Sequence, residues 1–426
     1  MLKIRLINIF KIILKLKKKL VYDKMKNSHY VPRFILKKFS DKLCLYNIKT
    51  GEFKENINPE RAFVEEGFYS DKIEEKLNRK LEKQFAMLLS EKILKCDNEI
   101  ELSRSELRLV KKFLLISVIR SMGNEQFLQK EKRFYDDLTD LFIKQGLSKE
   151  EAIKAAAKPF DEIQIPNETP YDYWMRTIDV ILDTDGSPEE ILKHPNKTYP
   201  AHRWAGVINA GYLAFWDSEY KRDEFVITDI GMTSENEKGW NGITVHNMKK
   251  TNFLMQLFQL EKDERMRQEI YKQLNFVMSF HENFEMFPIS AKRMIVEIAP
   301  FYKFRQAYKN FYPMPKLEDL SELVNEELYA PNENKYIYPQ TSIVPKYHQG
   351  DRYIYSIKQL TRDETRYCNA LFLDRINTTL GFSSLNKAVG SIVRYKIFNS
   401  FPYVPRVDYA ALYKIINERY QASLSI

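Results

Sequence analysis

Glycine is scarce in this chain, and its scarcity limits the folds open to the sequence. Only 13 of the 426 residues are glycine, about 3% against roughly 7% in an average protein. Doubly wound α/β sheets place glycine at their strand-to-helix turns, so that class is disfavoured. With 26 Tyr and 27 Phe the chain has ample apolar surface to bury. We therefore expect an α+β fold that is predominantly α-helical, with a small antiparallel sheet.

The chain divides into a basic tail, a helical N-terminal part with a β-hairpin, and a C-terminal α+β part, which cover residues 1–24, 25–165 and 170–426. Three prolines between residues 159 and 170 mark the linker between the last two parts. The stretch at about 312–350 is rich in Pro, Asn and Tyr, which predicts a long loop within the C-terminal part.

Local patterns predict several elements. Leu43–Ile48 and Phe53–Ile57 flank a short polar segment that contains Gly51, which predicts a β-hairpin. Ser103 and Glu106 have the spacing of a capping box, and they open an apolar helix that runs to about residue 121. Further strands are expected at 212–216, 225–228, 284–287 and 293–298.

The tail carries most of the positive charge. Residues 1–24 contain eight basic side chains and one acidic side chain, so they supply +7 of the formal net charge of +9 and leave +2 for the rest. A nearly balanced body is weak evidence for electrostatic binding of nucleic acid. Residues 2–20 have the pattern of a basic amphipathic helix, which can contact an anionic membrane surface. The alternative is a start at Met25, which would remove the tail.

Several kinds of site and location are disfavoured. The three cysteines are far apart, so they predict neither a disulfide framework nor a zinc cluster, and they fit a reducing cytoplasm. The sequence contains no run of about 18 uncharged apolar residues, which a transmembrane helix requires. It also lacks the GxxxxGK[ST] phosphate loop, GxGxxG, GxSxG and HExxH motifs.

The segment Asn27–Phe34, with the sequence NSHYVPRF, resembles the opening of a bacterial family, domain of unknown function 4238. The likeness covers about residues 25–400 and continues more loosely at 65–70, 107–121, 225–231, 287–290 and 369–377. At 228–231 the chain has Thr-Asp-Ile-Gly, without the Ser and the Asn-Pro of the family turn. The resemblance implies a role in antiviral defence, because members resemble genes carried beside phage-defence systems. It implies no particular reaction.

His29, Glu66 and Asp229 are the candidate catalytic residues. An imidazole can act as a base near neutral pH, and the carboxylates of Glu66 and Asp229 can hold a divalent metal ion such as Mg²⁺. Together they predict a metal-dependent nuclease or phosphodiesterase, in which the ion polarises phosphate and activates water. In the structural alternative, His29 caps the following helix, Glu66 lies in a solvated turn and Asp229 stabilises its own turn.

Arg33, Arg120 and Trp204 are the candidate ligand-binding residues. Arg33 can bind a phosphate or carboxylate through two hydrogen bonds. Arg120 can bind an anion at the end of an apolar helix, and Trp204 can present an exposed ring to a ligand. In the structural alternative, Arg33 pairs with an acidic residue and Arg120 complements the helix dipole.

We therefore expect a cytoplasmic anti-phage defence protein that acts on nucleic acid or nucleotides by metal-assisted hydrolysis. One alternative is a non-enzymatic sensor that binds a phage component and triggers growth arrest. Another is an effector that acts on the membrane surface through residues 2–20. The enzyme predicts that His29, Glu66 and Asp229 cluster in a pocket, whereas the sensor predicts that they are dispersed and that the protein has an exposed apolar patch instead.

Overall fold

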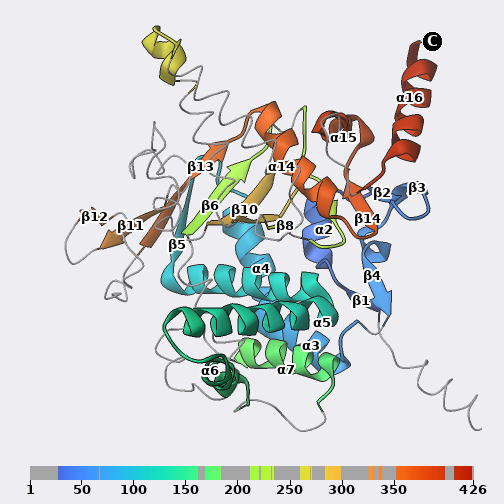
Figure 1. Cartoon of the computed structure of the whole chain (residues 1–426). Helices are drawn as coiled ribbons and strands as arrows, with labels where there is room; N and C mark the ends of the chain where they lie inside the picture. Colours follow the sequence, from blue (N-terminus) through green and yellow to red (C-terminus); the bar gives the residue numbers. More distant parts are fainter. Residues whose placement is uncertain are drawn as a thin grey trace, which may run out of the picture.

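A computed structural model of the chain describes residues 27–66, 68–161, 168–183, 212–219, 222–231, 233–234, 260–268, 270, 284–298, 326–330, 335–337, 352–398 and 407–424. Figure 1 shows these residues arranged around a large twisted sheet. The basic tail at 1–24 and the side chain of Trp204 lie outside the described residues. No helix in the described ranges is both long enough and apolar enough to cross a membrane.

The large sheet has eight strands and mixes parallel with antiparallel pairing. Its strand order is β12-β11-β13-β6-β10-β9-β8, and β5 also pairs with β13. The strands are β5 (Glu99–Ser103), β6 (Tyr212–Asp217), β8 (Thr233–Ser234), β9 (Phe284–Pro288), β10 (Arg293–Ile298), β11 (Glu326–Ala330), β12 (Lys335–Ile337) and β13 (Arg352–Gln359). Strand β13 runs parallel to β6 and antiparallel to β5 and β11. Strands β11 and β12 lie within the 312–350 stretch, whose composition is typical of a loop.

Two smaller sheets complete the β-structure. Strands β1 (Asn27–His29) and β4 (Val64–Glu66) form an antiparallel ribbon. The other sheet has the order β3-β2-β14-β7. Its strands are β2 (Leu43–Asn47), β3 (Phe53–Ile57), β7 (Ile227–Thr228) and β14 (Thr379–Phe382). The predicted hairpin is thus present as β2–β3, and Gly51 takes a φ of 70° at its turn, which glycine adopts without strain.

The expectation of one small antiparallel sheet in a predominantly helical fold is wrong, because the described residues form three sheets of two, eight and four strands. The error has a physical cause. Strand β6 is expected from its apolar run, but that run does not indicate which strands lie beside it, because Leu213–Asp217 are buried on both faces of the sheet. The neighbours of β13 come from distant parts of the chain, and local periodicity carries no information about such pairing.

Helices cover both faces of the large sheet. On one side lie α3 (Asp71–Leu77), α4 (Lys83–Leu88), α5 (Arg104–Lys144), α6 (Lys149–Asp161) and α7 (Pro170–Asp183), with the π-helical turns η2 (Asn78–Glu82) and η3 (Leu89–Ile93) between α3, α4 and β5. The remaining helices are α2 (Arg33–Phe39), α14 (Arg362–Arg375), α15 (Leu385–Phe398) and α16 (Ala410–Leu424). The predicted capping box opens α5, because Ser103 N donates to Glu106 Oε2 at 2.7 Å and Glu106 N donates to Ser103 Oγ at 3.3 Å.

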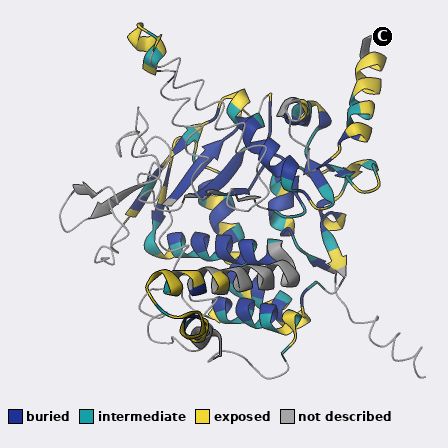
Figure 2. Ribbon diagram, in the orientation of Figure 1, coloured by how far each residue is buried: buried dark blue, intermediate teal, exposed yellow. Residues whose placement is uncertain are grey.

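Two apolar clusters hold these layers together, one on each face of the sheet. Alternate residues of β6, such as Leu213 and Phe215, pack with helix α5. The residues between them, Ala214 and Trp216, pack with α14 and α15. Figure 2 shows the central strands buried on both sides. A charged residue inside these strands is therefore removed from water, and it requires a specific partner.

Candidate functional site

Arg120 is a buried link between α5 and the β1–β4 ribbon. It is 4% exposed, and its guanidinium contacts three different segments of the chain. Nη2 donates to the carbonyl oxygen of His29 at 2.6 Å, Nη1 donates to Glu82 Oε1 at 2.5 Å, and Nε donates to the Tyr69 hydroxyl at 2.6 Å. All three guanidinium nitrogens thus donate to protein groups, so Arg120 has a structural role.

His29 lies on β1, opposite Val64 of β4. Burial, and then the positive charge of Arg33, lower the pKa of its imidazole, while hydrogen bonds to the backbone of residues 59 and 60 oppose this. No donor or acceptor among the described residues reaches the buried Nε2 atom. The helix that follows begins after Pro32, and no described side chain caps it, so the imidazole does not serve as that cap.

Asp229 follows β7 and joins its turn to the start of β14. Its Oδ1 accepts a hydrogen bond from Asn377 N at 3.1 Å, and its own amide donates to Thr379 O at 3.0 Å. Burial raises the pKa of the Asp229 carboxyl, and hydrogen bonds from residues 377–379 oppose the rise. Asp229 therefore binds backbone groups of the segment that leads into β14, a different contact from the bonds to its own turn that the structural alternative expects.

The structure brings the segment after His29 close to the Asp229 turn. The charge of Asp229, with that of Glu65, adds to the effect of burial and raises the pKa of the Tyr30 hydroxyl. Gly231, with a φ of 71°, lies so close to Val31 that a side chain there would begin 3.5 Å from Val31 Cγ2. The proximity is structural, because the imidazole and the carboxylate serve different neighbours.

Glu66 and Arg33 are two further residues that the sequence suggests for the site. Glu66 pairs with Asn27 in the ribbon, but its side chain lies outside the described part of the chain. Arg33 lies 3.6 Å from Glu60, with both side chains more than half exposed, and such pairs contribute little stability. In the described ranges, no three His, Cys, Asp or Glu side chains lie close enough together to hold a metal ion.

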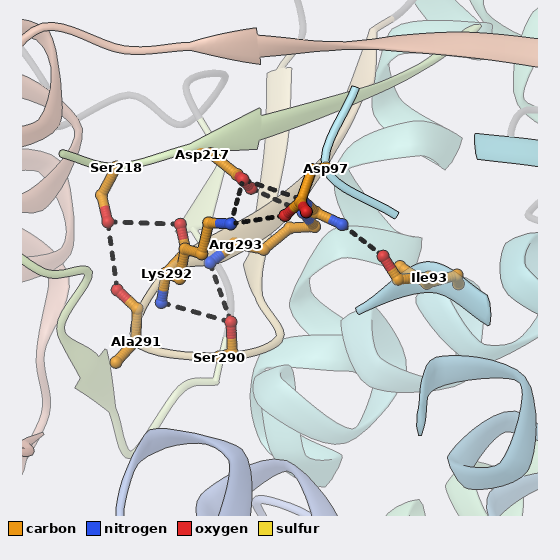
Figure 3. A network of polar contacts seen from close by, with 8 residues as sticks. All are labelled: Ile93, Asp97, Asp217, Ser218, Ser290, Ala291, Lys292 and Arg293. Carbon is orange, nitrogen blue, oxygen red and sulfur yellow. Dashed lines mark hydrogen bonds and ion pairs between the residues drawn. The ribbon is translucent and has the colours of Figure 1, made fainter. Parts of the chain in front are cut away.

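The charged residues buried in the large sheet include a tight ion pair between β6 and β10, which Figure 3 shows with its surroundings. Arg293 is 1% exposed and Asp217 is completely buried. Arg293 Nε lies 2.5 Å from Asp217 Oδ1, and Nη2 lies 2.7 Å from Oδ2. Lys292 Nζ, at 3.3 Å from Asp217 Oδ2, reaches the same carboxylate from the surface. The two charges satisfy each other through two hydrogen bonds, which is a structural role.

Glu297 is a second buried charged residue of β10, and it lies on the same face of the sheet as Arg293. Glu297 of β10 is directly opposite Glu285 of β9, so both carboxylates project toward the α5 side of the sheet. Ser234 of β8 is the next residue along this row. Glu297 is 5% exposed and Lys111 of α5 is 8% exposed, whereas Glu285 is partly exposed. The three residues form the carboxylate–lysine cluster, with Glu285 at its solvent side.

The electrostatics of this cluster are unusual for a sheet interior. Burial, and then the negative charge of Glu285, raise the pKa of Glu297 well above its ordinary value, while the charge of Lys111 lowers it. Within the described ranges, no group donates a hydrogen bond to Glu297 Oε2. Ionisation of both opposed carboxyls would destabilise the sheet, and the burial of a charged Glu297 would add to that cost. A cation between the carboxylates would relieve both costs.

The sequence contains a signal for this pair outside the standard catalytic motifs. Glu297 lies between Val296 and Ile298 in a strand whose residues 294–296 are also apolar, and glutamate rarely occupies such a position without a function or a partner. Residues 285 and 297 are also equidistant from the turn at 291, so a hairpin places them opposite each other. A search for acids inside predicted strands would have found both residues.

Comparisons with known proteins identify a family for this chain. The sequence model of a family described as "Protein of unknown function (DUF4238)" matches residues 27–380. No curated protein and no solved structure gives a significant match. The matched range includes the β1–β4 ribbon, Arg120, Asp229 and the carboxylate–lysine cluster. The chain therefore belongs to the DUF4238 family of proteins of unknown function.

Proposed function

We propose that this chain is an anti-phage defence protein that hydrolyses phosphodiester bonds in nucleic acid or nucleotides, with the carboxylate–lysine cluster as its reacting centre. The observation that carries the proposal is the opposed pair Glu285 and Glu297 beside Lys111. Groups with strongly perturbed pKa values and close charge partners are typical of catalytic sites. In the described residues, His29, Arg120 and Asp229 contact backbone or core groups instead.

Two carboxylates and a lysine support metal-assisted hydrolysis at the cluster. Mg²⁺ is commonly held by one or two carboxylates and completes its shell with water and substrate phosphate. Glu285 and Glu297 would hold such an ion, and the ion would supply Lewis-acid chemistry for phosphodiester hydrolysis. Lys111 would stabilise the negative charge that develops on the phosphoryl group. Glu285 is partly exposed, so ion and substrate would enter the cluster from the Glu285 side.

The first experiment measures cleavage by the purified full chain. Single-stranded and double-stranded DNA, RNA and cyclic nucleotides are incubated with Mg²⁺ or Mn²⁺, and with EDTA as the metal-free control. We expect Glu297→Gln to lower the cleavage rate by about 100-fold or more, since the metal is essential. Glu99→Gln changes an exposed glutamate of β5 in the same sheet, so it is the matched control. Equal rates for Glu297→Gln and the unaltered chain would refute the proposed site.

The second experiment tests the biological role by phage plating on a host that expresses each variant. We expect the unaltered chain and Glu99→Gln to protect the host, and Glu297→Gln to lose protection at equal protein levels. Protection that survives Glu297→Gln would favour the non-enzymatic sensor. A chain that starts at Met25 tests the membrane-surface effector. Loss of protection in this chain would favour that alternative, because only it requires residues 2–20. Failure of all variants against a broad phage panel would contradict the role in defence.

A further inference from the structure

We infer that Arg293 is a positioning residue, which sets the register of the β9–β10 hairpin and so keeps Glu285 opposite Glu297. The inference rests on the proposed function of these carboxylates and adds how the site is held in place. Its evidence is independent of the cluster, since it comes from the contacts of Arg293 in Figure 3.

The side chain of Arg293 fixes β10 against two other elements. Its fork is bidentate to Asp217, the residue directly opposite on β6. Its Nη1 atom donates to the carbonyl oxygen of Ile93, at the end of η3. Because both contacts are buried, sliding β10 along β6 would leave Asp217 as an uncompensated buried charge, which is strongly unfavourable.

The backbone of Arg293 fixes the turn of the hairpin. Its amide donates to Ser290 Oγ at 2.8 Å, and its carbonyl oxygen accepts from the amides of Ile289 and Ser290, both at 3.0 Å. The number of residues in a hairpin turn determines which residues of the two strands face each other. Arg293 therefore links the turn of the hairpin to the β6–β10 register.

The position of Glu297 depends directly on this register. Arg293, Ile295 and Glu297 alternate along β10 and share one face of the sheet. A change of one residue in pairing would place Val296 opposite Glu285 and direct Glu297 to the other face. That face is the apolar cluster that contains Met286 and Met294. The carboxylate pair would then no longer exist.

A lysine at position 293 provides the sharpest variant. Arg293 uses three N–H groups in a rigid fork to serve Asp217 and Ile93 together, and a lysine ammonium cannot reproduce that geometry. Arg293→Lys keeps the charge beside Asp217, so it avoids the buried unpaired carboxylate that would unfold an Arg293→Met chain. The matched control is Arg352→Lys, since Arg352 pairs with Glu101 at 3.2 Å across β13 and β5 of the same sheet.

Cross-linking reports the register without any activity. Glu285→Cys/Glu297→Cys reports the native pairing, because opposed Cα atoms about 4.5–5.5 Å apart suit a disulfide. Glu285→Cys/Val296→Cys reports the shifted pairing. The ratio of native to shifted cross-linking rates is measured by peptide mass spectrometry, which separates these bridges from pairing with the native cysteines. We expect Arg293→Lys to lower the ratio about tenfold and Arg352→Lys to leave it unchanged. An unchanged ratio in Arg293→Lys would overturn the inference.

Binding of Mn²⁺ to chains that keep both glutamates links the register to the site. We expect Arg293→Lys to weaken Mn²⁺ binding about tenfold or more, as supporting residues around metal sites commonly do, while the chain still unfolds cooperatively. Unchanged Mn²⁺ affinity with a lowered melting temperature would show a purely structural role and overturn the inference. A native chain that binds no Mn²⁺ and cleaves nothing would refute the proposed function, and the cross-linking ratio would still decide the register.

Discussion

Glu285 and Glu297 occupy directly opposed positions on β9 and β10, on the face of the sheet that α5 covers. Glu297 is almost completely buried there, and its pKa is raised by burial and by the Glu285 charge. A sheet selected only for stability would place apolar or oppositely charged residues at these positions. The pair therefore has measurable consequences for stability as well as for activity.

Glu297→Gln should stabilise the protein in the absence of metal. Burial and the Glu285 charge oppose ionisation of Glu297 in the folded chain, whereas the unfolded chain ionises this group readily, so glutamine removes a cost of folding. We expect a gain of about 1–2 kcal/mol in the free energy of unfolding, since uncompensated buried charges are costly. Urea denaturation with EDTA, compared with Glu99→Gln, measures it. A loss of stability of similar size would mean that the native carboxylates are already compensated.

The stability of the protein should fall as the pH is lowered through the range in which unfolded histidine gains a proton. The folded pKa of His29 lies below its ordinary value because of burial and the Arg33 charge. Below about pH 6.5 the unfolded chain therefore binds a proton at His29 that the folded chain does not, which favours unfolding. Urea unfolding at several pH values should show a weaker acid dependence in His29→Gln. Identical slopes for the two chains would contradict this assignment.

The two arginines that the sequence suggested as ligands should differ sharply in their effect on stability. Arg120→Met leaves Glu82, the Tyr69 hydroxyl and the His29 carbonyl without their buried partner, so we expect a loss of about 3–5 kcal/mol. Arg33→Met removes an exposed pair with Glu60, which predicts a change of less than about 1 kcal/mol. Denaturant titrations of both variants test the contrast, and equal losses would refute it.

Gly390 on α15 should not tolerate a side chain. A Cβ atom there would lie 2.4 Å from Nε and Nη2 of Arg366, and Arg366 Nε is 2.9 Å from the buried carboxylate of Asp223. Gly390→Ala should therefore displace the guanidinium and cost about 1–3 kcal/mol, as overpacking does, despite the better helix propensity of alanine.

Val393→Ala is the control for Gly390→Ala, because Val393 lies one turn along the same helix and is 41% exposed. It should change the free energy of unfolding by about 0.5 kcal/mol or less. If Gly390→Ala raised the melting temperature instead, Arg366 would have another position open to it beside Asp223.

The local elements could be predicted from the sequence, because their signals are local. The β2–β3 hairpin follows from its alternation and Gly51, and the start of α5 follows from the Ser103–Glu106 capping box. Strands β6, β9 and β10 were also expected from their apolar runs. The size and the mixed pairing of the large sheet could not be predicted, because β5, β6 and β13 meet only through tertiary structure.

The candidate site was harder to predict than the local elements. His29, Arg120 and Asp229 attracted interest as charged or titratable residues in family-like segments, but the contacts of Arg120 and Asp229 with backbone groups become visible only in three dimensions. Glu285 and Glu297 belong to no catalytic motif. Their significance comes from burial and from facing each other, and both properties depend on the β9–β10 register.

The pairing of β5 with β13 has a consequence for how the protein is made. Glu101 faces Ile354 in this pair, and Leu45 faces Gly381 where β2 meets β14. As the chain emerges from the ribosome, the early strands β2 and β5 have no native neighbour from the C-terminal half until nearly all of translation is complete. Their unpaired edges are open to wrong pairing during that interval. We therefore expect the nascent chain to depend on chaperones until its last strands have been synthesised.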